Sequence, residues 1–220
     1  MASKNRRIAF HSEVLSRRQH VALSRLGPVM SAMDFSLAGG TALALYLGHR
    51  RSIDFDWFSG KSMPDVLKFA QTVREHGVPL IVQQVDRGTL HASVLGVRTS
   101  FFEYKYPRLK APVPLKTHGC LLASLDDIAC MKLSAVAQRG TKKDFVDIFA
   151  LLKTHATLGR MLTLYRRKYS VADVLHVLHA LVYFDDAETE RMPRMIWNAE
   201  WSAIRNRIRK SVQRVANEKS

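Results

Sequence analysis

Three prolines close together divide the chain into two parts that differ in hydrophobic periodicity. Pro107, Pro112 and Pro114 interrupt regular structure, because proline lacks an amide hydrogen and fixes its own backbone angle. Before them, short apolar runs are separated by glycine turns, which is typical of strands; beyond them, almost every segment has the period of an α-helix. We therefore expect an α+β fold, with an α/β lobe over residues 1–115 and an all-helical lobe over residues 116–220.

The apolar pattern also predicts the order of elements within each lobe. In the first lobe, helices alternate with short strands until a run of three strands forms an antiparallel meander. In the second lobe, Ser124-Leu-Asp-Asp127 resembles a capping box and begins the first helix. The expected helices are 12–33, 42–47, 62–76, 124–138, 143–155, 158–169, 170–184 and 196–215, and the expected strands start near 35 and cover 53–58, 80–85, 89–95 and 97–104.

The chain carries a large excess of positive charge. Its 34 Lys and Arg residues against 19 Asp and Glu residues give a formal net charge of +15 and a pI near 10.2. The excess is concentrated in the first 25 residues, at 160–168 and from 191 to the C-terminus. A field of this kind attracts polyanions, so the uneven charge favours contact with nucleic acid over a basic surface that serves only solubility.

Cysteine usage and hydropathy indicate a cytoplasmic protein. Cys120 and Cys130 lie ten positions apart without ligand-type neighbours, so we do not expect a disulfide framework. No apolar run approaches the roughly 20 residues that a membrane-spanning helix needs. We therefore expect no membrane partner.

Two aspartates share one face of a predicted strand. Side chains alternate along a strand, so Asp54 and Asp56 point to one side while Phe55 and Trp57 point to the other. The two carboxylates are then about 6 to 7 Å apart, which is twice the strand rise. Two negative charges at that spacing repel each other unless a cation or a proton lies between them. We expect the pair to hold Mg²⁺ (or Mn²⁺) together with substrate phosphates.

A glycine pair upstream of the aspartates supplies a second feature. Gly39 and Gly40 would let the backbone approach a phosphate, because neither has a Cβ and because the N-terminus of a helix attracts anions. Neighbouring hydroxyl and guanidinium groups could add hydrogen bonds and positive charge. These further substrate-binding candidates are Thr41, Arg50, Arg51 and Ser52. Taken alone, a glycine pair is more often a tight turn, and Asp-x-Asp is often an exposed polar face.

Together these residues resemble a known family. Gly-Gly-Thr-Ala-Leu from Gly39, followed by Gly-His-Arg-x-Ser-x-Asp-x-Asp-x-Phe ending at Phe58, is similar to the AbiEii/AbiGii toxin family. A second match, Asp-Ile-Ala-Cys-Met-Lys ending at Lys132, is followed by Arg139 and by Lys-Asp-Phe-Val-Asp-Ile from Lys143. The resemblance implies a polymerase-β-like nucleotidyltransferase lobe, with a mixed or antiparallel sheet and helices, and a helical lobe that contributes to the active-site cleft.

The resemblance also implies roles for individual residues. Asp54 and Asp56 would bind metal, and the glycine turn with Thr41 and Ser52 would cradle a triphosphate. The implied residues of the second lobe are Lys132 on the phosphates, Asp144 as a later functional carboxylate or a helix cap, and Asp147 in a structural role. Arg139 follows Lys132 by two helical turns, so both can project from one helix face. Glu103 is the best-placed candidate for a third catalytic carboxylate, against its being an ordinary exposed strand residue.

Three functions fit these features. The first is transfer of a nucleotidyl group from an NTP to an acceptor hydroxyl, on RNA such as a tRNA end or on an acceptor protein, by the toxin of a bacterial toxin–antitoxin or abortive-infection system. An antitoxin protein would then be a partner. The second is a non-catalytic module that binds a nucleotide or RNA on the same fold. The third is modification of a small hydroxylated molecule, whose binding would be insensitive to salt.

Overall fold

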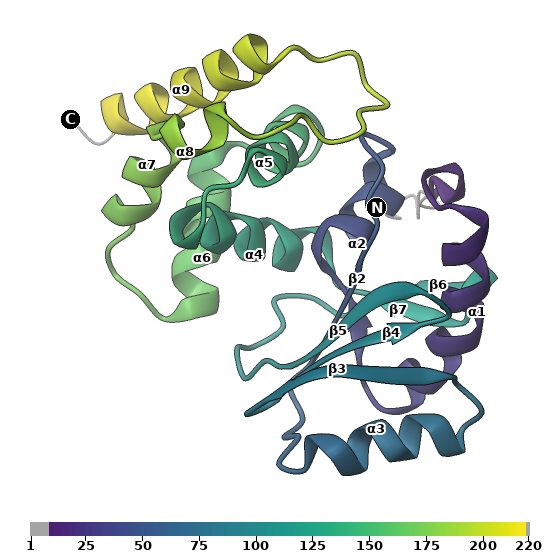
Figure 1. The fold of residues 1–220 in the computed structure, drawn as a ribbon. Coiled ribbons are helices and arrows are strands. Elements are labelled where there is room, and N and C mark those ends of the chain that lie inside the picture. The colour runs from purple at the N-terminus through teal and green to yellow at the C-terminus, as the bar shows by residue number, and fades with distance from the viewer. Residues whose placement is uncertain (1–8, 219–220) are drawn as a thin grey trace, which may run out of the picture.

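The computed structural model describes residues 9–218, which form a mixed sheet and a set of helices (Figure 1). The strands are β1 (Ser36–Leu37), β2 (Phe55–Ser59), β3 (Leu80–Asp86), β4 (Thr89–Val94), β5 (Val97–Glu103), β6 (Val113–Leu115) and β7 (Cys120–Leu122). The helices are η1 (Ser12–Val14), α1 (Arg17–Ala32), α2 (Gly39–Leu47), α3 (Val66–Glu75), η2 (Lys116–His118), α4 (Leu125–Gln138), α5 (Lys142–Thr154), α6 (Leu158–Tyr169), α7 (Leu175–Val182), α8 (Asp185–Glu188) and α9 (Trp201–Asn217). The expected α+β class is confirmed.

The sheet has the strand order β3-β4-β5-β2-β1-β7-β6. The meander β3-β4-β5 is antiparallel, as predicted, and β2 lies parallel to β5 with Asp56 opposite Ser100. β2 is antiparallel to β1, and β1 is parallel to β7. The chain therefore places β2, which carries Asp56, at the centre of the sheet, and Asp54 stands just before this strand.

The sheet extends past the boundary expected between residues 115 and 116. β7 returns beyond that point and pairs with β1 through Leu37 and Leu122, so the α/β part continues to Leu122. β6 contains Pro114, although the prolines of this region predicted irregular structure there. It is tolerated because β6 lies at the edge of the sheet, where an amide hydrogen is not needed on the outer side.

Several helices differ in extent from the expected ranges. The first divides into η1 and α1, because Ser16 and Gln19 form a capping box that starts α1 at Arg17. Pro28 lies inside α1 rather than ending it. The left-handed Ser170 ends α6, so the helix expected over 170–184 begins only at Leu175. The helix expected from 196 begins at Trp201, after an irregular segment.

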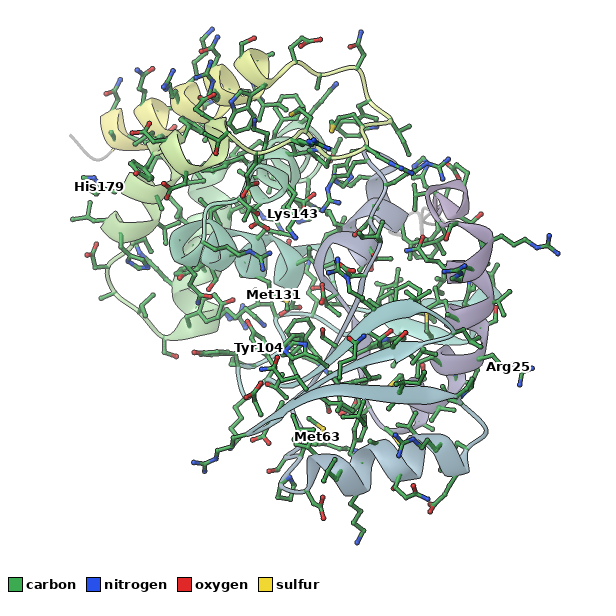
Figure 2. All side chains as sticks on the ribbon, viewed as in Figure 1. Arg25, Met63, Tyr104, Met131, Lys143 and His179 are labelled. Carbon is green, nitrogen blue, oxygen red and sulfur yellow. The ribbon has the colours of Figure 1, made fainter. Side chains whose placement is uncertain are left out.

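The two faces of the sheet have different partners. Phe55, Trp57 and Phe101 are fully buried on one face, where Phe101 contacts Phe69 of α3 at 5.2 Å between ring centroids. The opposite face is directed toward the helices of the second part. Helix α2 lies between this face and those helices, in contact with β2, α4 and α5 (Figure 1). Tyr104, Met131 and Lys143 mark the line along which the two parts meet (Figure 2). The polar face of β2 thus opens onto this junction.

Within residues 9–218, no helix is both long and apolar enough to cross a membrane. Cys120 and Cys130 are both buried free thiols. Burial raises the pKa of each to about 12, which keeps both thiols protonated near neutral pH.

Candidate functional site

The glycine turn at Gly39 and Gly40 packs against β2, the strand that carries Asp56. Gly39 has φ +61° and begins α2, and a Cβ there would collide with the Asp56 carboxylate. A Cβ at Gly40 would lie 2.5 Å from Nη2 of Arg50 and 2.9 Å from Oγ of Ser52. Both positions therefore need glycine, one for its backbone angle and both for space.

The N-terminus of α2 is open toward the same place. Among the described residues no side chain caps it, and the amide of Ala38 donates to the carbonyl of Asp56 at 2.8 Å. The amides of the first helical turn have no partner within the helix, and the helix dipole adds partial positive charge there. An anion placed beside Asp56 would therefore meet the start of this helix.

Asp56, the second residue of β2, and Asp54, just before the strand, line one cavity at the junction. Asp54 stands just before the strand and accepts two hydrogen bonds from Arg98 of β5, at 2.8 and 3.2 Å. Asp56 is half-buried and, within the described part of the chain, its carboxylate has neither a hydrogen bond nor an ion pair. Burial raises the pKa of Asp56; Lys132 opposes this shift and Asp54 adds to it. Within the described residues, Asp56 thus lacks a direct ion-pair partner, whereas Asp54 has one in Arg98.

The donor set fits a hard divalent cation. Asp54 and Asp56 offer carboxylate oxygens that line one cavity, and the Asp56 carboxylate lies in the place that a Cβ of Gly39 would need. Mg²⁺ is commonly bound through one or two carboxylates plus substrate phosphates. Within residues 9–218, no group of three or more His, Cys, Asp or Glu side chains is arranged to hold a metal, so the remaining ligands would come from substrate and water.

A second aspartate pair lies deep beneath this surface. Asp147 of α5 is fully buried and accepts hydrogen bonds from Arg50 at 2.7 and 2.8 Å. His49 hydrogen-bonds it at 2.8 Å, and Nζ of Lys132 lies 2.6 Å from its other oxygen. Burial alone would raise the pKa of Asp147, but Arg50 and Lys132 outweigh burial and hold it well below its usual range.

Asp144, the other member of this pair, is equally buried. It accepts hydrogen bonds from Arg139 at 2.8 and 3.0 Å, from Thr141 at 2.5 Å and from Lys132 at 3.3 Å. Burial opposes ionisation here too, yet Arg139 and Lys132 lower the pKa of Asp144 to about 2. Lys132 therefore bridges Asp144 and Asp147, and its charge also reaches Asp56.

The other residues expected to bind substrate differ in how accessible they are to a ligand. The Thr41 hydroxyl is buried and donates to the carbonyl of Asp54, so it fixes the strand and does not face the junction. Arg50 is buried in its pairing with Asp147. Arg51 is exposed, and the side chain of Ser52 lies beside Gly40. Thus Arg51 and Ser52 are open to a ligand, whereas Thr41 supports the site from below.

Glu103 is not brought to the aspartates. It pairs with Ser59 across β2 and β5, which puts it on the face opposite Asp56. Its carboxylate accepts from the amide of Met63 at 2.8 Å and pairs with Lys105 at 2.8 Å. The position beside Asp56 on β5 is Ser100, whose hydroxyl hydrogen-bonds His91 at 2.9 Å. A third carboxylate is therefore not found where the sequence led us to expect it.

Two adjoining cavities meet at Asp56. The basic cavity, of about 310 Å³, is lined by seven cations and two carboxylates, which are Arg50, Arg51, Arg98, Lys132, Arg139, Lys143, Arg194, Asp54 and Asp56. The aromatic cavity, of about 420 Å³, is lined by rings from β2, β5, α6 and the loop after β5, namely Phe58, Phe102, Tyr104, Tyr106, Tyr165 and Tyr169. Asp56, Lys132 and Arg139 belong to both cavities.

Sequence reasoning did not identify three of these cations as site residues. Arg98 reaches Asp54 only because β5 lies parallel to β2. Arg194 lies in the irregular segment before α9, and the carbonyl of Arg194 accepts from the amide of Arg51 at 2.8 Å. Lys143 was part of the family motif, which was the one signal that could have pointed to it. The other two became site residues through long-range contacts without a local pattern.

Comparisons with known proteins agree with this geometry. The family model described as "Nucleotidyl transferase AbiEii toxin, Type IV TA system" matches residues 21–216. An uncharacterised protein of Aquifex aeolicus, aq_aa25, is 39% identical over 179 residues, which cover 80% of this chain and 86% of that protein.

Solved structures share the fold at low sequence identity. A putative nucleotidyltransferase from H. pylori matches with a TM-score of 0.57 and 15% identity, over 93% of this chain and 97% of that one. MenT4, a nucleotidyltransferase toxin from Mycobacterium tuberculosis H37Rv, matches with a TM-score of 0.58 and 16% identity, over 88% and 81% of the two chains. The family model matches most of the length of this chain, and the structure brings together the glycine turn and the aspartates of the family motif. The chain belongs to the AbiEii nucleotidyltransferase toxin family.

Proposed function

We propose that this protein transfers a nucleotidyl group from an NTP to an acceptor hydroxyl. The observation that carries the proposal is the position of Asp56, which lies where a strongly basic cavity meets an aromatic one. Seven cations suit a triphosphate, and aromatic walls suit a nucleoside. The donor triphosphate and the acceptor end would therefore meet beside this carboxylate.

The residues of the basic cavity have distinct tasks in this reaction. The acceptor oxygen attacks the α-phosphorus, its bond to the bridging oxygen breaks, and pyrophosphate leaves with the electron pair while the acceptor proton passes to solvent. Lys132 and Arg139 line both cavities together with Asp56, so they can meet the negative charge that develops on pyrophosphate. The open N-terminus of α2 would hold a phosphate in line.

Asp54 and Asp56 would hold Mg²⁺ (or Mn²⁺), which supplies orientation of the α-phosphate and stabilisation of its transition state when bound. To hold the cation, Asp54 would have to give up its pairing with Arg98. Arg98, whose side chain is 67% accessible, would then be free to contact phosphate.

RNA, such as a tRNA end, is the acceptor that the net charge of +15 favours. Family membership supports a role as the toxin of a bacterial toxin–antitoxin or abortive-infection system, acting in the cytoplasm and neutralised by an antitoxin protein. MenT4 is itself described as a nucleotidyltransferase toxin, which supports the same assignment.

Incubation with each labelled NTP, Mg²⁺ and total tRNA tests the proposal. The wild-type protein should label RNA, and the Asp54→Ala/Asp56→Ala variant should lose at least about a thousandfold in rate, or about 4 kcal/mol of transition-state stabilisation. Equal labelling by the double variant would refute the assignment of these residues. Labelling that stops when EDTA is added, and returns with Mg²⁺ or Mn²⁺, would support the metal requirement.

A non-catalytic module that binds a nucleotide or RNA is the second candidate. Two observations favour it: Ser100 occupies the position beside Asp56, and Arg98 neutralises Asp54 without a metal. Such a module would retain RNA affinity in the double variant, and its wild-type form would transfer no label to RNA, protein or small hydroxylated acceptors under any metal condition.

A further inference from the structure

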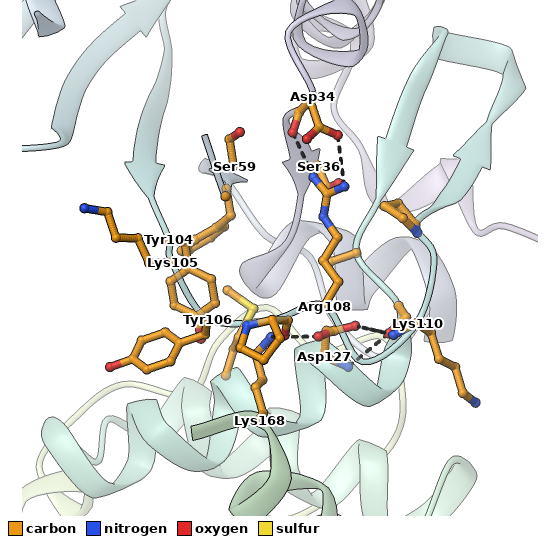
Figure 3. A pocket seen from close by; sticks show the side chains of 17 residues that line it. Asp34, Ser36, Ser59, Tyr104, Lys105, Tyr106, Arg108, Lys110, Asp127 and Lys168 are labelled. Atoms are coloured by element: carbon orange, nitrogen blue, oxygen red, sulfur yellow. Dashed lines mark hydrogen bonds and ion pairs between the residues drawn. The ribbon is translucent and has the colours of Figure 1, made fainter. Parts of the chain in front are cut away.

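The cations that line the cavities of this protein differ in whether a carboxylate neutralises them. A cavity of about 380 Å³, which shares part of its lining with the aromatic cavity, shows one extreme (Figure 3). All four of its cations pair with carboxylates at 2.7 to 2.9 Å: Lys105, Arg108, Lys110 and Lys168 pair with Glu103, Asp34, Asp126 and Asp127, respectively. The charges of this lining are balanced without a ligand.

The basic cavity is different, because three of its cations are not neutralised. The other four are paired, namely Arg98 with Asp54, Arg50 with Asp147, and Lys132 and Arg139 with Asp144. The three that remain, which we call the unpaired trio, are Arg51, Lys143 and Arg194. All three are exposed, and within residues 9–218 their side chains have neither a hydrogen bond nor an ion pair. Three such cations on one cavity attract an anion.

Arg194 reaches the cavity on a segment that is tied down at both ends. Residues 190–197, which we call the strap, lie between α8 and α9 and run back to the chain after α2 (Figure 1). At one end, the carboxylate of Glu190 accepts from the amide of Lys142 at 2.8 Å. At the other end, the carbonyl of Arg194 accepts from the amide of Arg51 at 2.8 Å, and two more amides of the strap donate to the segment after α2 at 2.9 and 3.0 Å. These contacts use the backbone, so the Arg194 side chain is held at the cavity and left free, which lowers the entropic cost of binding.

The unpaired trio lies on one side of the candidate site. Asp56, Lys132 and Arg139 line both the basic and the aromatic cavity, whereas the trio lines the basic cavity alone. An NTP whose α-phosphate lies at Asp56 would therefore extend its β- and γ-phosphates toward the trio. The γ-phosphate carries up to about two negative charges near neutral pH, and the β-phosphate adds about one. A diphosphate is one phosphate shorter, so it would leave part of the trio without a partner.

We propose that the unpaired trio binds the terminal phosphates of the donor nucleotide and selects a triphosphate over a diphosphate. Arg194, carried by the strap, donates to the γ-phosphate, and Arg51 and Lys143 contact the β- and γ-phosphates from two other segments of the chain. This inference rests on the proposed function and adds a determinant of its specificity, which lies beside the C-terminal helix and outside the family motif.

Binding in the absence of an acceptor is the direct test. The probes are the α,β-methylene analogues of the four NTPs and the matching NDPs, titrated with Mg²⁺ in an isothermal titration calorimeter. The wild type should bind its preferred NTP analogue at least about tenfold more tightly than the NDP, because a charge-assisted hydrogen bond is worth that much or more. Arg194→Ala should remove most of this preference. Its NDP affinity should change less than about twofold, which also shows that the variant is folded.

Two further variants of the strap sharpen the test. Arg194→Lys should keep a stronger preference than Arg194→Ala, since the positive charge is retained. Arg191→Ala is the matched control, because Arg191 is exposed, belongs to the strap and lines none of the three cavities. It changes the net charge equally and should leave the preference unchanged. A preference that Arg194→Ala alters less than twofold would overturn the inference, as would an equal loss in Arg191→Ala.

Transfer kinetics separate this inference from the proposed function. Arg194→Ala should raise KM for the NTP at least about fivefold and leave KM for RNA unchanged. If the wild type transfers no nucleotide but prefers the triphosphate through Arg194, the proposed reaction falls and this site stands. If transfer occurs and Arg194→Ala raises KM for RNA in place of KM for the NTP, the reaction stands, the trio contacts the acceptor backbone, and the inference falls.

Discussion

The protein contains two aspartate pairs whose surroundings differ in every respect that matters for function. Asp144 and Asp147, three apart on α5, are fully buried and receive guanidinium or ammonium groups at 2.6 to 3.3 Å. Asp54 and Asp56, two apart around the start of β2, face the cavities, and only Asp54 has a cation against it. The pKa of Asp144 and of Asp147 is lowered, whereas that of Asp56 is raised.

The difference shows how charge balance distinguishes a scaffold from a candidate cation site. A buried carboxylate persists in a fold when paired cations offset its desolvation, and removing one partner is then costly. A half-buried carboxylate that lacks such partners stores unfavourable free energy until a ligand supplies positive charge. The same residue type therefore ties α4 and α5 to the segment after α2 in one region and, in the proposed function, would hold a cation in the other.

The largest effect on stability is expected at the buried pair. Asp147→Ala removes the carboxylate with which both Arg50 and Lys132 pair, so the free energy of unfolding should fall by about 3 kcal/mol. For a chain of this length, that lowers Tm by about 8 °C. Asp56→Ala should not lower Tm, because it removes an unpaired charge. Thermal unfolding of both variants by circular dichroism checks the contrast, and similar losses of Tm would break it.

Acid should remove the contribution of Asp144. Its folded pKa of about 2 lies below its usual 3.8, so its ionised form stabilises the fold above pH 4, and this stabilisation disappears as pH falls toward 2. The stability gap between wild type and Asp144→Asn should shrink by about 2 kcal/mol over that range. Urea unfolding at pH 5, 4, 3 and 2 measures the gap. A constant gap would mean that Arg139 and Lys132 do not hold this carboxylate ionised.

The smallest effect is expected at Glu103. Glu103→Gln should change the rate of nucleotidyl transfer less than about twofold, because the carboxylate lies on the sheet face opposite Asp56 and contacts Met63 and Lys105. A steady-state assay against the same RNA measures this. A loss of a hundredfold would show that Glu103 does serve as the third carboxylate.

Local patterns in the sequence predicted part of the surroundings of Asp56. Strand alternation predicted Asp54 and Asp56 on a common face; β2 begins only at Phe55, so Asp54 stands just before the strand, and both residues line the basic cavity. The cap at Ser124 correctly predicted the start of α4, where its side chain accepts from the amide of Asp127. Two helical turns likewise put Lys132 and Arg139 on one side of the cleft.

Features that depend on pairing between distant segments could not be predicted. The face on which Glu103 lies is set by the register of β5 against β2, and a shift of one residue would reverse it. The pairing of Arg98 with Asp54 spans 44 positions and depends on the same register. The burial of Arg50 depends on α5, about a hundred residues away. Sequence alone showed Arg50 as a cation available to substrate.

Binding of Mn²⁺ tests the central claim, that the strand pair is the one poised for a cation. Mn²⁺ is titrated into the wild type with a non-hydrolysable NTP and followed by electron paramagnetic resonance. The account predicts protein-bound Mn²⁺ in the wild type and in Glu103→Gln, and its loss in Asp56→Asn while the fold persists. Undiminished Mn²⁺ binding by Asp56→Asn would contradict it.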